Sequence, residues 1–323
     1  MNARVHQHLS HQDGLISRPQ ALQAGLQQHD LRRLVRRREW AVVHPGVYVT
    51  HTGPLTWHQR AWAAVLLAWP AALAAESALR AADGPGSKDR APEDIVRVAV
   101  ARHRSRLVTP DDVRIQHLAG LDQKVLWNLT PPRMRYEEAA LDVAIAAGSE
   151  LATVSALAKA CQSRRTTARR LRSTLADRTR VARREWIDAV LEDIAAGSCS
   201  ALEHGYLNRV ERAHGFPPAE RQVRATASIG VVYRDAKYGE ECFVELDGRL
   251  FHESVPQRDR DFALDLDAAV NMESTIRLSW GQVFDRPCST TAKLVVVLRA
   301  HGVHVSPHAC GPGCPVGGVG LVA

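Results

Sequence analysis

The feature that most restricts the fold of this sequence is a series of short apolar runs in its last third, where acidic residues interrupt the pattern. One run covers residues 229–233 and leads to Asp235, and the next covers residues 242–247. Side chains of a strand alternate between its two faces, so Glu245 and Asp247 are expected on one face and the apolar residues around them on the other. The pattern predicts a sheet with carboxylates on adjacent strands.

These acids are expected to need a cation if they lie together. Neighbouring ionised carboxylates raise each other's pKa, and a hard divalent ion such as Mg²⁺ relieves the repulsion because it prefers oxygen ligands. An ion held in this way can polarise a phosphate and activate water. The alternative for Asp247-Gly248 is a plain turn, since Asp-Gly is a strong hairpin signal.

The first segment, residues 1–52, has the order helix, short turn, basic helix and hairpin. Ser17 can cap the first helix before Pro19, and Gly25 can end it. A second helix at about residues 29–38 is followed by a hairpin that turns at Pro45-Gly46. We expect a winged helix-turn-helix, whose second helix enters the DNA major groove. The expected DNA-binding residues are Arg32, Arg33, Arg36, Arg37 and His44. The alternative is a winged helix that contacts protein while its arginines are solvated.

Two further segments form the predicted middle of the chain. Residues 53–134 read as a small α/β domain, with an Ala-rich helical hairpin at 61–82 and strands at 94–101 and 112–118. Residues 135–199 read as a helical region with a belt of arginines. That belt either lines a groove for phosphates or is a solvated face that acids elsewhere balance.

The charge of the chain favours an anionic partner. Lysine and arginine number 42 against 35 acidic residues, for a net charge of +7, and arginine blocks carry much of the excess. Blocks of arginine are typical of proteins that grip phosphates, so we expect nucleic acid, most simply double-stranded DNA. The polar start is no secretory signal, the Ala-rich stretch is no membrane span, and six scattered cysteines make no disulfide framework. We therefore expect a cytoplasmic protein, with association with the nucleoid an option.

The last segment, residues 303–323, is rich in Gly, Pro and Cys. His304, His308, Cys310 and Cys314 form a pattern of zinc-ligand types, but three residues between the two cysteines is not the usual spacing. Composition therefore favours a flexible tail without structural zinc. Elsewhere the sequence has no glycine loop that would cradle a nucleotide cofactor and no nucleophile motif of an esterase.

The N-terminal segment resembles the winged-helix domain of AbiEi-type antitoxins. The resemblance rests on Leu15-Ile16-Ser17-Arg18, Leu31 to Val35, Trp40 and Pro45-Gly46-Val47-Tyr48, and covers about a sixth of the chain. It implies DNA binding, usually at a promoter, and leaves room for a cognate toxin or another protein partner.

Residues 200–302 resemble the PD-(D/E)XK nuclease superfamily, and within it the domain related to very-short-patch-repair (Vsr) endonucleases. The matching segments include Leu202-Glu203, Tyr233-Arg234-Asp235, Val244 to Arg249, Asp259-Arg260-Asp261 and Arg277 to Trp280. The resemblance implies that Asp235 and Glu245 are the two metal-ligand acids and that Glu203 is the helix acid that completes the site.

One position departs from that superfamily. A lysine normally stands two residues after the second acid, and this chain has Asp247 there. Vsr-like enzymes lack the lysine and use a histidine, for which His252 is the candidate. Alternatively, Lys237 or Arg258 stabilises the charge that develops on phosphorus.

Two hypotheses follow for an α/β (α+β) chain with a winged helix, an α/β and helical middle, and a restriction-endonuclease-like core whose mixed sheet is flanked by helices. The first is a DNA endonuclease that uses Mg²⁺ or Mn²⁺ to hydrolyse phosphodiester bonds. The second is a catalytically degenerate regulator of the antitoxin or repressor type. Fold alone does not distinguish them.

Overall fold

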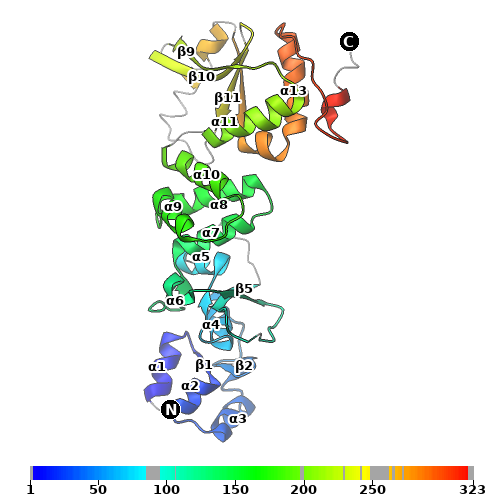
Figure 1. The fold of residues 1–323 in the computed structure, drawn as a ribbon. Coiled ribbons are helices and arrows are strands. Elements are labelled where there is room, and N and C mark those ends of the chain that lie inside the picture. Colours follow the sequence, from blue (N-terminus) through cyan, green and yellow to red (C-terminus); the bar gives the residue numbers. More distant parts are fainter. Residues whose placement is uncertain are drawn as a thin grey trace. The chain divides into compact units, whose positions relative to one another are not determined.

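The computed structural model divides the chain into two compact units (Figure 1). One comprises Met1–Ala146 with Ala160–Thr166, and the other comprises Ala147–Lys159 with Thr167–Ala323. Each unit combines helices with sheet, which confirms the predicted α/β class. The structure describes residues 3–84, 95–105, 107–196, 200–227, 230–240, 242–247, 262–263, 266–270 and 273–318.

The N-terminal elements have the order of a winged helix-turn-helix. The strands form a three-stranded antiparallel sheet in the order β1-β3-β2, in which Ile16 pairs with Tyr48 and Val42 also pairs with Tyr48. Strands β2 and β3 make the wing, as the Pro45-Gly46 turn predicts. The elements are α1 (Ala3–His11), β1 (Leu15–Ser17), α2 (Arg18–Gln23), α3 (Gln28–Arg36), β2 (Ala41–His44) and β3 (Val47–Val49).

Local signals in the sequence account for the start of α2. The Ser17 hydroxyl accepts a hydrogen bond from the Gln20 N–H, and the Gln20 side chain accepts one from the Ser17 N–H at 3.0 Å. This reciprocal capping box satisfies two N–H groups that a helix start leaves without partners. Pro19 follows inside the first turn, where the absence of an N–H costs nothing.

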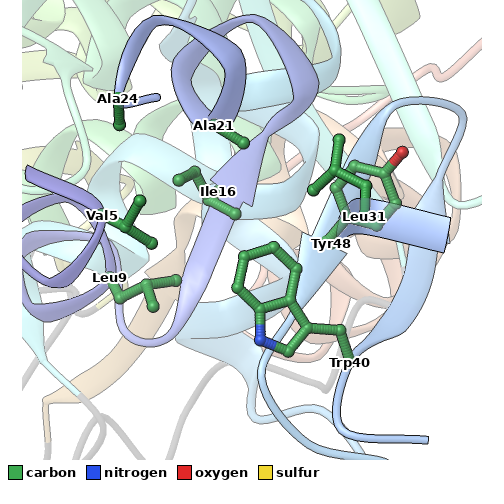
Figure 2. Packing of buried hydrophobic residues seen from close by; sticks show 8 residues of the cluster. All are labelled: Val5, Leu9, Ile16, Ala21, Ala24, Leu31, Trp40 and Tyr48. Carbon is green, nitrogen blue, oxygen red and sulfur yellow. The ribbon is translucent and has the colours of Figure 1, made fainter. Parts of the chain in front are cut away.

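A hydrophobic cluster holds these short helices on the sheet (Figure 2). Leu31, the fully buried residue of α3, packs with Trp40 and Tyr48, whose ring centroids lie 6.1 Å apart. Val5 and Leu9 of α1 and Ile16 of β1 complete the inner part of the same cluster. Burying an aliphatic side chain of this size contributes about 1.5–3 kcal/mol, so Leu31 is the main anchor of α3.

A five-stranded mixed sheet follows in the same unit, in the order β6-β5-β4-β8-β7. The predicted strands appear as β5 (Val96–Ala101) and β6 (Val113–Leu118), paired in parallel. The other elements are α4 (Trp57–Leu67), β4 (Ala72–Leu73), α5 (Ala75–Asp83), α6 (Leu121–Lys124), β7 (Val125–Leu126), β8 (Arg133–Met134) and α7 (Tyr136–Ala146).

The helical hairpin predicted at residues 61–82 is interrupted by a short strand. Between its two helices, the two residues of β4 pair with β5 on one side and with β8 on the other. Periodicity could not reveal this strand, because a run of buried Ala and Leu fits a buried helix and a buried strand equally well.

The predicted arginine belt follows α8 (Glu150–Gln162) and lies on α9 (Ala168–Asp177), at the start of α10 (Arg184–Ala196) and in the turns on either side of α9. Several of these arginines are paired within the chain. Arg172 holds Asp188 through two hydrogen bonds of 2.8 Å, and Arg184 donates to the carbonyls of Leu175 and Arg178. These contacts favour the balanced face over a phosphate groove for this part of the belt.

The last part of the chain builds a four-stranded sheet in the order β12-β11-β10-β9. Strand β10 pairs antiparallel with both β9 and β11, and β12 pairs with β11 in parallel. The elements are α11 (Ser200–Tyr206), the π-helix η1 (Leu207–Glu211), the 3-10 helix η2 (Arg212–His214), β9 (Glu220–Ala227), β10 (Gly230–Tyr238), β11 (Cys242–Asp247), β12 (Ser274–Ser279), η3 (Gly281–Asp285), α13 (Pro287–Ala300) and η4 (Pro315–Gly318).

The described part of the C-terminal segment lies against this unit. The His308 N–H donates to the His214 carbonyl at 3.1 Å, and the Arg299 guanidinium donates to the Val305 carbonyl at 3.2 Å. Val316 is buried. Among the described residues, no helix is long and apolar enough to span a membrane.

Candidate functional site

The predicted acidic residues lie on neighbouring strands. Asp235 is on β10, and Glu245 and Asp247 are on β11; all three are half-buried. In the pairing of the two strands Ala236 lies opposite Val244, and the Asp235 carboxylate accepts the Leu246 N–H at 2.7 Å. The side chain of Asp235 is thus fixed against the strand that carries the other two acids.

Three of the acids have raised pKa values. Burial raises the pKa of Glu203 on α11, and the charge of Asp235 raises it further. Burial also raises the pKa of Asp235. The hydrogen bond from the Leu246 N–H lowers this pKa in part, and the charge of Asp247 raises it further. Burial raises the pKa of Glu245, partly offset by Arg234, and Asp235 raises it again. Mutual repulsion therefore links acids from three separate elements.

The acids are not as tightly gathered as a finished metal site. Among the described residues, the atoms that all lie within 4.8 Å of one another belong to a histidine and three cysteines, and Glu203, Asp235 and Glu245 form no such group. A cation shared by these three carboxylates would require their side chains to move closer.

Arg234 is a residue of this site that the sequence analysis did not assign. Its guanidinium is buried, donates to Glu245 at 3.0 Å and to Glu273 at 3.3 Å, and lies 5.2 Å from the centre of the Phe243 ring. Arg277 lies opposite Glu245 in the pairing of β11 with β12. The chain itself therefore supplies positive charge beside Glu245.

Of the remaining predicted catalytic residues, some lie on the sheet and others lie outside the described residues. Lys237 lies on β10, the strand that carries Asp235. Its ammonium pairs with Glu240 at 3.6 Å and lies 5.9 Å from the centre of the Phe243 ring. Asp247 ends β11. His252 and Arg258 lie outside the described residues.

A buried hydrogen-bond network at the end of β10 was also not predicted from the sequence. The hydroxyls of Tyr206 and Tyr238 lie 2.8 Å apart, and the Tyr238 hydroxyl donates to Glu211 at 2.8 Å. Arg221 of β9 completes the network by donating to Glu211. It ties β10 to the π-helix, three residues beyond Asp235. A tyrosine in a strand is ordinary, so nothing in the linear sequence could have marked Tyr238.

The predicted DNA-binding arginines, three on α3 and Arg37 directly after it, are exposed. Arg33 pairs with Asp30 at 3.0 Å, and Arg37 lies 3.9 Å from Glu39. In the described part of the chain, neither Arg32 nor Arg36 has an acidic partner within salt-bridge distance. Their charge is available to an anion.

His44 differs from these arginines. Its side chain is buried at the end of β2, and burial lowers its pKa, against a smaller opposing effect of Asp112. A buried neutral imidazole offers no charge to a phosphate. Of the predicted DNA-binding residues, the four arginines are therefore the exposed ones.

The expectation of a tail without structural zinc is overturned. His214, Cys288, Cys310 and Cys314 each place one ligand atom in a group whose members all lie within 4.8 Å of one another. Two of these residues belong to the predicted set. His304 and His308 do not join them: the His304 ring lies 3.3 Å from the Ser306 hydroxyl, and the His308 ring stands beside Gly215.

The cysteines of this cluster are free thiols. Burial, followed by the neighbouring sulfurs of Cys310 and Cys314, raises the pKa of Cys288 to about 12. Spacing along the chain could not identify the set, because His214 and Cys288 are separated by the whole β9–β12 sheet. Only the fold brings them together.

Comparison of the sequence with models of known families gave no match, and neither did comparison with curated proteins.

Proposed function

We propose that this is a DNA-binding protein whose C-terminal sheet binds a divalent metal ion and hydrolyses phosphodiester bonds. The observation that carries the proposal is the raised pKa of Glu203, Asp235 and Glu245, which come from three different elements. Carboxylates that burial and mutual repulsion both destabilise are typical of sites built for a cation or for proton transfer.

Asp235 and Glu245 are the proposed metal ligands, and Glu203 is the third. Asp235 uses Oδ2 for the Leu246 N–H, which fixes the orientation of the carboxylate, while Oδ1 has only a 3.4 Å contact with Gln222. That oxygen can turn toward a cation at little cost. A bound Mg²⁺ would polarise the phosphate and lower the pKa of the attacking water.

Residues around these ligands have supporting roles in the proposal. Lys237 stabilises negative charge on the phosphate once its ammonium leaves Glu240, which is 95% exposed and holds it only weakly. His252 is proposed to take a proton from the attacking water. Arg234 must yield part of its hold on Glu245 when a metal ion binds.

The winged helix supplies affinity in this proposal. Arg32 and Arg36 project from α3 without acidic partners within salt-bridge distance in the described chain, which suits contacts with phosphates. Such contacts release counterions, so binding should weaken steeply as salt rises. Binding that stays constant between low and moderate salt would contradict this part of the proposal.

A second function, a DNA-binding regulator without nuclease activity, is favoured by Arg234. Its buried guanidinium already compensates Glu245 and Glu273, so the acids have an internal counter-charge without any metal ion. Asp247 at the usual lysine position favours the same function. On this view the sheet is a scaffold for DNA or for a protein partner such as a toxin.

Cleavage and binding measured together separate the two functions. Plasmid and short duplex DNA are incubated with Mg²⁺ or Mn²⁺ and with the wild type, Asp235→Asn or Glu245→Gln. A nuclease requires metal-dependent cutting that both variants lose while they still bind DNA. The matched control is Glu185→Gln, an exposed acid on α10 whose loss should leave cutting unchanged. Tight binding without cutting under either metal makes the protein a regulator.

A further inference from the structure

Four side chains from separate places in the chain converge on one point. His214 ends η2, Cys288 lies in the first turn of α13, and Cys310 and Cys314 lie in the C-terminal segment. Their ligand atoms all lie within 4.8 Å of one another. We propose that these four residues bind one structural Zn²⁺ ion, independently of any reaction at the acidic residues.

His214 provides the strongest reason. Its side chain is completely buried, and Nδ1 lies 3.0 Å from the Val210 carbonyl, to which it can donate its proton. Nε2 then has no proton and must accept, yet it has no hydrogen-bond partner in the described chain. A buried acceptor without a partner is rare in folded proteins. Metal-binding histidines commonly donate the other ring N–H to a carbonyl in this way.

The sulfur positions suit a metal ion better than a disulfide. The Sγ atoms of Cys288 and Cys310 are 3.4 Å apart, whereas a disulfide bond measures about 2.05 Å. Four ligands around zinc with Zn–S bonds of about 2.3 Å have sulfurs separated by roughly 3.8 Å. A small outward shift of the thiols, two of which are only partly buried, would open the cluster to that size.

The donor set identifies the metal and the kind of site. Three cysteines and one histidine make a soft, four-membered set without an oxygen ligand, which fits Zn²⁺ and excludes Mg²⁺ and Ca²⁺ as natural occupants. Four protein ligands complete a tetrahedron and leave no position for water or substrate. The proposed role is therefore structural, not catalytic.

The position of the ligands indicates what the ion would stabilise. His214 precedes β9 and Cys288 follows β12 and η3, so the ion closes the chain around the whole acid-bearing sheet. Cys310 and Cys314 attach the C-terminal segment to the same point. That segment already approaches closely: a Cβ at Gly215 would lie 3.0 Å from the His308 ring, and Gly215 has a φ of +69°.

The first measurement is the zinc content of the untagged full-length protein, purified without chelators, by mass spectrometry of the metal. We expect about one Zn²⁺ per chain. Cys288→Ser and Cys314→Ser should lose it. Cys161→Ser is the matched control, because Cys161 is a free cysteine of α8 outside the cluster, and it should keep its zinc.

Titration of the metal-free wild type with Co²⁺ tests the geometry without relying on the folding of any variant. Tetrahedral coordination by thiolates should give intense visible absorption and a thiolate-to-metal charge-transfer band, and Zn²⁺ should displace both. Chelation should also lower the melting temperature of the wild type and of Cys161→Ser.

Two results would overturn the proposal. One is a folded wild type that contains no zinc and gives no tetrahedral Co²⁺ spectrum. The other is a Cys288–Cys310 disulfide in protein purified under reducing conditions, found by thiol titration and peptide mapping, since it would remove two of the four ligands. Loss of nuclease activity alone bears on the acidic residues and not on this ion.

Discussion

Two clusters of ionisable side chains lie in the same compact unit, and they differ in how their charges are compensated. On the sheet, Glu245 accepts a hydrogen bond from the buried Arg234 guanidinium, and Asp235 accepts the Leu246 N–H. At the start of α13, a ring nitrogen of His214 and three sulfurs lie within 4.8 Å of one another, and Nε2 of His214 has no hydrogen-bond partner in the described chain. The acids can persist without a metal ion, whereas the histidine and cysteines are arranged as if one were present.

The raised pKa values of a group of side chains and the close approach of their ligand atoms are therefore separate properties of a candidate metal site. Burial and mutual repulsion raise the pKa values of the three acids, but their carboxylate oxygens do not all lie within 4.8 Å of one another. The ligand atoms of the histidine and the three cysteines, in contrast, all lie within 4.8 Å of one another.

The largest expected effect is that of Arg234→Ala. Removing one partner of a buried ion pair typically costs about 3–5 kcal/mol, because the remaining charges are left buried. Here Glu245 and Glu273 would both lose the guanidinium with which they form ion pairs. Urea unfolding measures the loss, with Arg224→Ala on the exposed edge strand β9 as the control. If the acids bind Mg²⁺, adding Mg²⁺ should restore part of the stability of Arg234→Ala; no restoration argues against a metal site.

Gly215→Ala should have the next largest effect. The new Cβ would meet the His308 ring at 3.0 Å, and the backbone has a left-handed φ that alanine resists. We expect a loss of about 1–2 kcal/mol and weaker retention of zinc during dialysis against a chelator. Gly148→Ala is the control, since nothing lies within 4 Å of a Cβ there. Unchanged zinc retention would separate the close approach of His308 from the metal cluster.

Arg32→Ala and Arg36→Ala should each weaken binding to duplex DNA by about 1 kcal/mol, or roughly fivefold. Each should also reduce the dependence of log Kd on log salt by about one. Arg172→Ala is the control, because its guanidinium is already bound to Asp188. Fluorescence anisotropy at several salt concentrations measures both quantities. Equal losses in all three variants would mean that net charge, and not the winged helix, governs binding.

The smallest expected effect is a change of pH dependence in Glu203→Gln. The pKa of Glu203 is raised in the folded state, so the folded protein holds this proton more tightly than the unfolded chain. The associated stability is complete below the unfolded pKa and is lost as pH rises through the folded pKa. Glutamine should remove this slope, and Mg²⁺ should reduce it in the wild type if Glu203 is a ligand. Thermal melts across mildly acidic pH measure it, and Glu185→Gln should keep the slope.

Much of the fold was predictable because its signals are local. The Ser17 cap, the Pro45-Gly46 turn and the strands at β5, β6 and β11 depend on neighbouring residues that sequence patterns display directly. The two-residue strand β4 was missed because its partners β5 and β8 are distant in the chain. A strand that exists only through its neighbours leaves no periodicity of its own.

The candidate sites divide in the same way. Alternation along β11 correctly separated the half-buried Glu245 and Asp247 from the buried Leu246. The role of Arg234 could not be predicted, because an arginine beside an acid in sequence is more often solvated than buried. Cys310 and Cys314 were recognisable as ligand types, but their partners His214 and Cys288 are supplied by folding.

The path of the chain between its compact units has a consequence for how such a protein can change in evolution. The chain enters the second unit at Ala147, returns to the first at Ala160, and leaves it again after Thr166. The returning segment is bonded in place: Thr166 donates to the buried Glu137 at 2.8 Å, and Arg165 pairs with Asp83 at 3.2 Å. Because the chain passes between the units three times, a gene fusion with one breakpoint would interrupt one of the two units. The two units can be exchanged as modules only by two coordinated recombination events, which favours their inheritance together.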